Sequence, residues 1–259
     1  MLRRTTALST ALLAVLVATG TAVAQAPDTA QTHTVAVLDF DNNSGKPDYD
    51  SLGKGIAAMM VTDLSNVQGI QLVERQHLHD LVDELNLQQT QYVDSATAGK
   101  IGRLAGADYV VVGSLTAIDP RMRIDTRVLR VQTGEIVKTA QVQGDQDRFF
   151  ELERKLSNEL IDGLQISLSP EDRQRLAAEQ EANRIDRLQT ALAFSQALDF
   201  FERKQYVQAL GRMHVVMETN PGSPMTQLLY QQIEQKAKDS AAQRVRRGLG
   251  GLLRRATGD

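Results

Sequence analysis

The sequence predicts an α/β domain, in which helices flank a mixed sheet, followed by an all-α domain. Between residues 34 and 166 the apolar residues switch repeatedly between strand and helix spacing, and beyond Pro170 only helix spacing remains. The chain has 259 residues, of which 42% are hydrophobic and 24% charged, an ordinary globular composition. That length is enough for one good core or two.

The first residues have the pattern of a secretory signal peptide. Two arginines precede an apolar run from Ala11 to Ala18, and small residues follow as far as Ala24. This run is too short to span a bilayer, because a spanning helix needs about 20 apolar residues. We therefore expect residues 1–24 to be removed on export and the mature protein to be periplasmic. The chain has no cysteine, so neither disulfides nor a lipid anchor on cysteine is expected.

The first half of the α/β domain alternates strands with helices. The run "TVAVLDF" predicts a buried strand. After a polar loop at 41–50, apolar residues from Leu52 to Leu64 predict a helix that Asp50 or Ser51 can cap. A second strand follows at "IQLVE", and apolar stripes at 78–85 and 98–105 predict two more helices. The β-branched run "ADYVVVGSL" predicts a third strand.

A hairpin and a closing helix complete this domain. The segments "RIDTRVLRV" and "EIVKTAQVQ" alternate apolar and polar residues on either side of Thr133-Gly134, which is typical of a β-hairpin with one solvated face. Apolar residues from Phe149 to Leu164 then recur at helical spacing. The predicted α/β domain covers 34–166.

The all-α domain is predicted at 170–240. Ser169 and Pro170 are typical of a helix start, and a heavily charged connector follows. A helical hairpin comes next, and five of its residues match the spacing of a tetratricopeptide repeat: Ala197, Phe200, Tyr206, Ala209 and Pro221. Such arrays usually need about three repeats, so an unrelated helical pair remains an alternative.

The last segment, 241–259, is predicted to be a basic flexible tail. It carries five arginines around Leu249, Leu252 and Leu253. Contact with anionic lipid is an alternative, but Gly248, Gly250 and Gly251 disfavour a helix. We expect membrane contact to be peripheral at most.

One candidate for phosphate binding lies at the start of the first helix. Gly53, Gly55 and Ala58 fit a loose dinucleotide-binding spacing, and Glu74 lies where a ribose-binding acid belongs. In a true fingerprint the glycines turn the chain directly out of the strand, whereas here a loop intervenes. We interpret them as small residues that let the helix pack closely on the sheet.

Two groups of polar residues suggest acid chemistry or metal binding. Asp39, Asp41, Asp48 and Asp50 are close in sequence, but no base, nucleophile or regular ligand spacing accompanies them, so turn and cap roles are expected. His77 and His79 are two residues apart on a predicted helix and point in different directions. We predict no catalytic residue, no cofactor and no metal site, and therefore no enzyme.

Several motifs together resemble the CsgG family, the curli production assembly and transport components of the Gram-negative envelope. They are "IQLVERQHLHDLVDELNLQ", "GKIGRLAGADYVVVGSLTAID" and "LRVQTGEIV", in addition to the segment "VLDFDNNSGKPDYDSLGKGIAAMM". The most specific parts are Glu74-Arg75-Gln76, Gly106-Ala107-Asp108 and Thr133-Gly134-Glu135. The resemblance covers residues 34–166 in order.

The resemblance implies an envelope protein, but this chain departs from the pore-forming members. Those are lipid-anchored and form rings that span the outer membrane through two β-hairpins per subunit. Each membrane strand needs about 9–11 residues, whereas the corresponding sites here hold only 117–121 and 144–148. We therefore expect a periplasmic relative without a channel.

The functional prediction is a periplasmic accessory or scaffold in curli-type or related envelope assembly or secretion. Its partners would be envelope proteins, with a homo-oligomeric ring as a further possibility. The alternative is a regulator or adaptor that docks through its helical hairpin on an envelope synthase or motility apparatus. The net charge of −3 and pI near 5.9 argue against nucleic acid.

Overall fold

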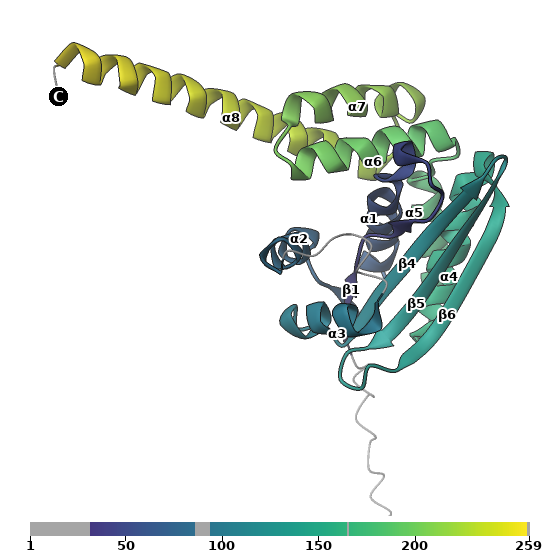
Figure 1. The fold of residues 1–259 in the computed structure, drawn as a ribbon. Helices are drawn as coiled ribbons and strands as arrows, with labels where there is room; N and C mark the ends of the chain where they lie inside the picture. The colour runs from purple at the N-terminus through teal and green to yellow at the C-terminus, as the bar shows by residue number, and fades with distance from the viewer. Residues whose placement is uncertain (1–31, 86–93, 165, 258–259) are drawn as a thin grey trace, which may run out of the picture. The chain divides into compact units, whose positions relative to one another are not determined.

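A computed structural model describes residues 32–85, 94–164 and 166–257 (Figure 1). The predicted signal peptide lies outside these residues. The described chain begins with a sheet that has helices on both faces and ends with helices only. The predicted fold class is therefore confirmed.

The sheet is mixed, and its strand order is β3-β1-β4-β5-β6, with the short β2 beside β4. β1 runs parallel to β3 and β4, whereas β4, β5 and β6 are antiparallel neighbours. The strands are β1 His33–Val37, β2 Asp41–Asn42, β3 Ile70–Leu72, β4 Tyr109–Ile118, β5 Arg121–Arg130 and β6 Ile136–Asp145.

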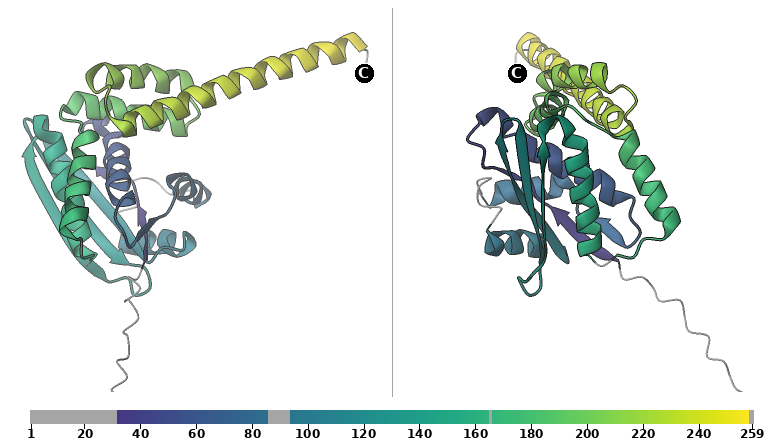
Figure 2. Two further views of the ribbon diagram at one scale, coloured as in Figure 1. Left: turned by 180° about the vertical axis from the view of Figure 1, so that it is seen from behind. Right: turned by 90° about the vertical axis from the view of Figure 1, so that its right-hand side faces the viewer.

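Four helices cover the two faces of the sheet. Apolar residues of α1 and α4 pack on one face, and those of α2 and α3 pack on the other. Figure 2 shows this arrangement from two further directions. The helices are α1 Leu52–Ser65, α2 Arg75–Glu84, α3 Ser95–Leu104 and α4 Phe149–Gly163, with 3-10 turns η1 Pro47–Tyr49 and η3 Gln146–Arg148.

The connections within the antiparallel part are short. β5 and β6 are joined around Gly134, whose φ of +74° lies in the left-handed region that favours glycine. β4 and β5 are separated only by Asp119 and Pro120, and β6 leads into α4 through η3. These connections agree with the prediction that neither site holds a membrane hairpin.

The helical part contains α5 Pro170–Ala182, α6 Leu188–Glu202, α7 Tyr206–Thr219 and α8 Pro224–Thr257. Ser169 caps α5 as predicted, because its Oγ accepts a hydrogen bond of 3.1 Å from the amide of Asp172. α6 and α7 form the predicted helical hairpin, in which Ala197 and Ala209 are fully buried. Whether this hairpin is a tetratricopeptide repeat stays a prediction.

One apolar core continues from the sheet into the helical part. The same cluster of buried residues includes Val111 of β4, Met60 of α1, Phe194 of α6 and Ile233 of α8. Near the predicted boundary at 166–170 the chain therefore changes from mixed α/β to all-α structure, but the apolar core continues across it.

The structure differs from the sequence predictions in three details. The loop at 41–50 contains β2, which was not predicted. Ser51 occupies the N-cap position of α1, but its side chain makes no capping hydrogen bond. α8 continues through 241–257, so this segment is helical where a flexible tail was predicted, because the helix tolerates its three glycines.

Candidate functional site

The junction between α1 and α6 is tightly packed. A Cβ atom on Gly55 would lie 1.9 Å from Ser195 Oγ of α6, and one on Gly53 would lie 1.8 Å from the carbonyl oxygen of Phe40. Both distances are too short for a side chain. The two glycines thus allow close packing, as predicted for Gly53, Gly55 and Ala58. The partner of Gly55 is a helix, however, and not the sheet.

A chain of alternating acidic and basic side chains crosses this junction. Its order is Asp39, Arg75, Glu202, Lys54, Asp199 and Arg203. Arg75 Nη2 lies 3.0 Å from both Asp39 Oδ1 and Glu202 Oε1. Lys54 Nζ pairs with Glu202 and lies 3.1 Å from Asp199 Oδ1. Four separate elements therefore meet in one ionic network.

Burial makes this network sensitive to the loss of any member. Burial alone would raise the pKa of Glu202, but Arg75 and Lys54 hold it below the ordinary value. Burial would lower the pKa of Lys54, yet Glu202 and Asp39 raise it above the ordinary value. Both groups are thus charged at neutral pH, and removing one would leave a buried opposite charge without compensation.

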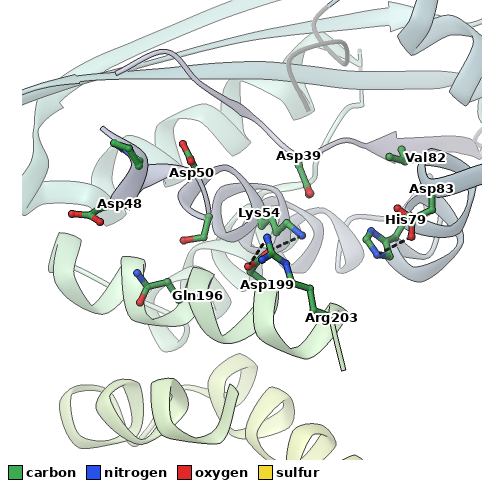
Figure 3. A pocket seen from close by; sticks show the side chains of 12 residues that line it. Asp39, Asp48, Asp50, Lys54, His79, Val82, Asp83, Gln196, Asp199 and Arg203 are labelled. Carbon is green, nitrogen blue, oxygen red and sulfur yellow. Dashed lines mark ion pairs between the residues drawn. The ribbon is translucent and has the colours of Figure 1, made fainter. Parts of the chain in front are cut away.

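A polar cleft of about 360 Å³ opens beside the network (Figure 3). Its walls come from the loop after β1, from α2 and from α6. The labelled lining residues are Asp39, Asp48, Asp50, Lys54, His79, Val82, Asp83, Gln196, Asp199 and Arg203. Lys54, the amine in this lining, is already paired with two carboxylates.

The structure separates the four candidate aspartates. Asp39 pairs with Arg75, and Asp50 Oδ1 accepts a hydrogen bond of 2.7 Å from Asn42 Nδ2. Asp48 lies in the first turn of η1. Three of the four line the cleft. Asp50 is the C-cap of η1, a cap role as predicted, whereas the ion pair of Asp39 was not predicted. Within the described ranges, no group of three or more acidic or histidine residues is arranged to hold a metal ion.

Asp41 is the exception among these aspartates. It is 4% exposed in β2, and its Oδ1 has no hydrogen-bond partner among the described residues. Burial, with a smaller contribution from Asp39, raises the pKa of Asp41 to about 6. Asp41 does not line the polar cleft, so its carboxyl is a buried group at the sheet and not part of an acid pair there.

The two candidate histidines do not share a site. His77 is exposed, whereas His79 lines the cleft, where its Nε2 lies 3.5 Å from Asp83 Oδ2. Leu78, between them, is buried against the sheet. The separation of the two rings agrees with the prediction from helical spacing.

A second polar cluster, which the sequence analysis missed, lies between α1, α4 and α5. Asp63 and Glu153 are 6% and 3% exposed. Gln180 Nε2 donates to Asp63 Oδ2 at 2.7 Å, and Ser157 Oγ donates to Glu153 Oε1 at 2.9 Å. Burial raises the pKa of Asp63 to about 6, and burial together with Asp63 raises the pKa of Glu153 well above the ordinary value. A hydrogen bond between the two carboxyl groups also raises the pKa of Glu153 and lowers that of Asp63.

An apolar groove of about 490 Å³ runs between α1, α5, α6 and the start of α8. Val61, Phe194, Met225 and Leu228 line it, and Leu228 is 59% exposed. Glu179 contributes a buried carboxylate oxygen that has no hydrogen-bond partner within the described part of the chain. The groove therefore offers apolar surface beside one unsatisfied acceptor.

The motifs that resemble the CsgG family have structural roles in this fold. Arg75 is the centre of the ionic network. Gly106 has a φ of +67° and follows the end of α3, after which Asp108 Oδ2 accepts a hydrogen bond of 2.8 Å from the amide of Thr34 in β1. Gly134 makes the β5–β6 turn.

Comparison with protein families tests this resemblance directly. Residues 17–123 match the family described as curli production assembly/transport component CsgG. The CsgG resemblance is thereby confirmed as far as residue 123, whereas the motif "LRVQTGEIV" lies beyond the matched residues. The matched CsgG region ends within β5, so α4 and the helical part lie beyond it.

A curated relative is "Putative adenylate cyclase 3" of Rhizobium meliloti (strain 1021). It is 25% identical over 191 residues, which are 73% of this chain and 30% of that protein. The CsgG-like chain thus spans about a third of the length of this relative.

Three solved structures from bacteria show a likeness of fold. The LpoB C-terminal domain from Salmonella enterica is 21% identical with a TM-score of 0.39, covering 47% of this chain and 88% of that one. Lipoprotein GNA1162 from Neisseria meningitidis is 13% identical with a TM-score of 0.40, covering 53% and 99%. A PelC dodecamer from Paraburkholderia phytofirmans is 18% identical with a TM-score of 0.33, covering 55% and 95%.

The family match indicates an accessory role associated with the cell envelope. A periplasmic or envelope location is consistent with this role. Among the described residues, none of the helices combines the length and the apolar character that crossing a membrane requires.

Proposed function

We propose that this chain is a non-enzymatic periplasmic scaffold in curli-type or related envelope assembly or secretion. The observation that carries the proposal is the match of residues 17–123 to the CsgG family, together with short connections between β4 and β5 and between β6 and α4. Pore-forming members would insert membrane hairpins there, between β4 and β5 and between β6 and α4. A family member with neither hairpin acts beside the transport machinery and does not itself form the channel.

The site geometry supports binding in preference to catalysis. The ionic network beside the polar cleft pairs its charged groups with one another across α1, α2 and α6, so these groups stabilise the junction. The apolar groove provides a surface for an apolar segment of an envelope protein, whose hydrogen-bond donor would satisfy Glu179. Leu228 marks the exposed side of this groove.

A second candidate is a regulator or adaptor that docks on an envelope synthase or motility apparatus through the α6–α7 hairpin. The observation that favours it is the outer side of α7, where Val207 and Val215 are 72% and 44% exposed. This surface is separate from the groove, since neither valine lines it.

The two candidates are tested by placing a photo-crosslinking amino acid at Leu228 or Val207 in cells that make the full chain. Crosslinks from Leu228 to an envelope assembly or secretion protein, or to a second copy in a closed multiple of the subunit mass by light scattering, support the scaffold. Crosslinks from Val207 to an identified envelope synthase or motility protein, with a monomeric mass, support the adaptor. Ile118, 73% exposed at the β4 end, is the control position.

Two results would overturn the proposal. The first is a monomer at all concentrations that forms no crosslink from Leu228 above the Ile118 control. The second is turnover of a substrate by the purified chain. The appropriate substrate to assay is ATP with a divalent metal ion, because the curated relative is described as a putative adenylate cyclase.

A further inference from the structure

The last part of α8 extends away from the helices that pack on its start (Figure 1). The side chains from Ala241 to Arg246 are all exposed, and Val245 is 62% exposed. By contrast, Leu229 and Ile233 near the start of α8 are 7% and 0% exposed. One helix thus has a packed beginning and, from Ala241 to Arg246, an exposed stretch.

The helical backbone from Ala241 to Thr257 sorts this segment into two faces. Consecutive residues of an α-helix are turned by about 100°. All alanines, valines and leucines of the segment then fall in one arc of about 120°, as wide as the apolar stripe of a surface helix. In order around the arc these are Ala241, Leu252, Val245, Ala256, Leu249, Ala242 and Leu253.

This apolar arc is not a continuation of the surface that packs inside the molecule. The same geometry places Leu229 and Ile233 roughly 160° around the helix from the centre of the arc. Since those two residues belong to the buried core, the arc at the end of α8 faces elsewhere. The apolar arc is therefore available to bind something other than the α6–α7 hairpin of the same chain.

The charge of the segment indicates which occupant. From Ser240 to Gly258 the sequence contains five arginines and no acidic residue, and all five arginines lie outside the apolar arc. Arg244 and Arg246 make no ion pair with another described residue, whereas Lys238, nearer the start of α8, pairs with Glu234 at 2.9 Å. A second copy of the same helix would bring like charges together, but an anionic surface would compensate them.

We propose that residues 241–257 are an amphipathic helix that binds the surface of an anionic phospholipid bilayer. The apolar arc enters the headgroup region, and the arginines contact lipid phosphates on either side of it. This gives the chain a peripheral attachment to the membrane that needs no lipid-modified cysteine. The proposal goes beyond the scaffold function, since either candidate function can operate at a membrane surface.

Vesicle co-sedimentation with the purified full chain tests this proposal. We expect binding to vesicles of about equal parts phosphatidylglycerol and phosphatidylcholine, weaker binding as salt is added, and little binding to phosphatidylcholine alone. The double variant R254Q/R255Q should bind about 25-fold more weakly, because each basic residue near an anionic surface contributes about fivefold.

A second variant tests the apolar arc. V245E places a charge in the arc and should also reduce vesicle binding strongly, whereas I118E, a matched substitution of an exposed apolar residue on β4, should not. Far-ultraviolet circular dichroism of each free variant checks that the fold is kept.

Three outcomes would overturn the proposal. They are equal binding to both vesicle types, unchanged binding of R254Q/R255Q, and binding to the soluble polyanion heparin without binding to anionic vesicles. The heparin result would mean that the arginines recognise phosphate or sulfate groups without a bilayer.

Discussion

The buried carboxyl pair between α1 and α4 makes stability depend on pH in a direction opposite to most acidic groups. Asp63 has a pKa of about 6 in the folded chain, against an ordinary value of 3.8. The folded state thus holds this proton more tightly than the unfolded chain. The contribution of protonated Asp63 to the stability of the folded state is fully present below pH 3.8, and it is lost as the pH rises through about 6.

The substitution D63N removes this dependence. A change of one in pKa corresponds to about 1.4 kcal/mol, so the penalty on ionised Asp63 above pH 6 is about 3 kcal/mol. The new side-chain amide would still accept the hydrogen bond from Gln180, and it can donate one to Glu153. We therefore expect D63N to be up to about 3 kcal/mol more stable than the wild type at about pH 8 and equally stable at about pH 3.5.

The assay is urea unfolding of both proteins from about pH 3.5 to about pH 8. The control is D83N, because the side chain of Asp83 is 70% exposed and its replacement should shift stability little at any pH. A D63N protein that is less stable than the wild type by the same amount at both ends of this range would refute the reasoning, since the loss would then be one of packing alone.

Two further predictions concern the junction between α1 and α6. G55A should lower the free energy of unfolding by about 1–3 kcal/mol, because its Cβ would overlap Ser195. The control G211A, where nothing lies within 4 Å of the added Cβ, should stabilise α7 by up to about 1 kcal/mol. Thermal melts compare the two variants, and equal effects would contradict the packing argument. E202Q should lower the free energy of unfolding in urea by about 3–5 kcal/mol, because two buried cations lose their shared carboxylate. The control E159Q, in an exposed ion pair, should lower it by about 1 kcal/mol or less. Similar losses would show that the network contributes no more to stability than a surface pair.

Local signals in the sequence were enough to predict most elements. The Thr133-Gly134 turn predicted the hairpin because only a few residues separate the two alternating strands. Ser169 predicted the start of α5 because its capping bond reaches only three residues ahead. The two-residue β2 was missed because it has no periodicity of its own and depends on the neighbouring β4.

The candidate site could not be predicted in the same way. Arg75 and Glu202 are 127 residues apart in the chain, and nothing in the local pattern of either indicates the other. Gly55 was correctly interpreted as a packing residue, but its partner on α6 depends on how the helical part folds back. The Asp63 and Glu153 pair left only a faint signal, a carboxylate within each apolar stripe.

The shared core of the sheet and the helices has a consequence for how this protein could be divided. A protease that cut between α4 and α5 would not release two independent fragments, because α1 contacts α6 at Gly55 and Lys54. Separating the fragments would expose this contact surface. A gene ending after α4 would expose the same surface. The sheet and the helices that follow it therefore share one core and are best regarded as one folding unit.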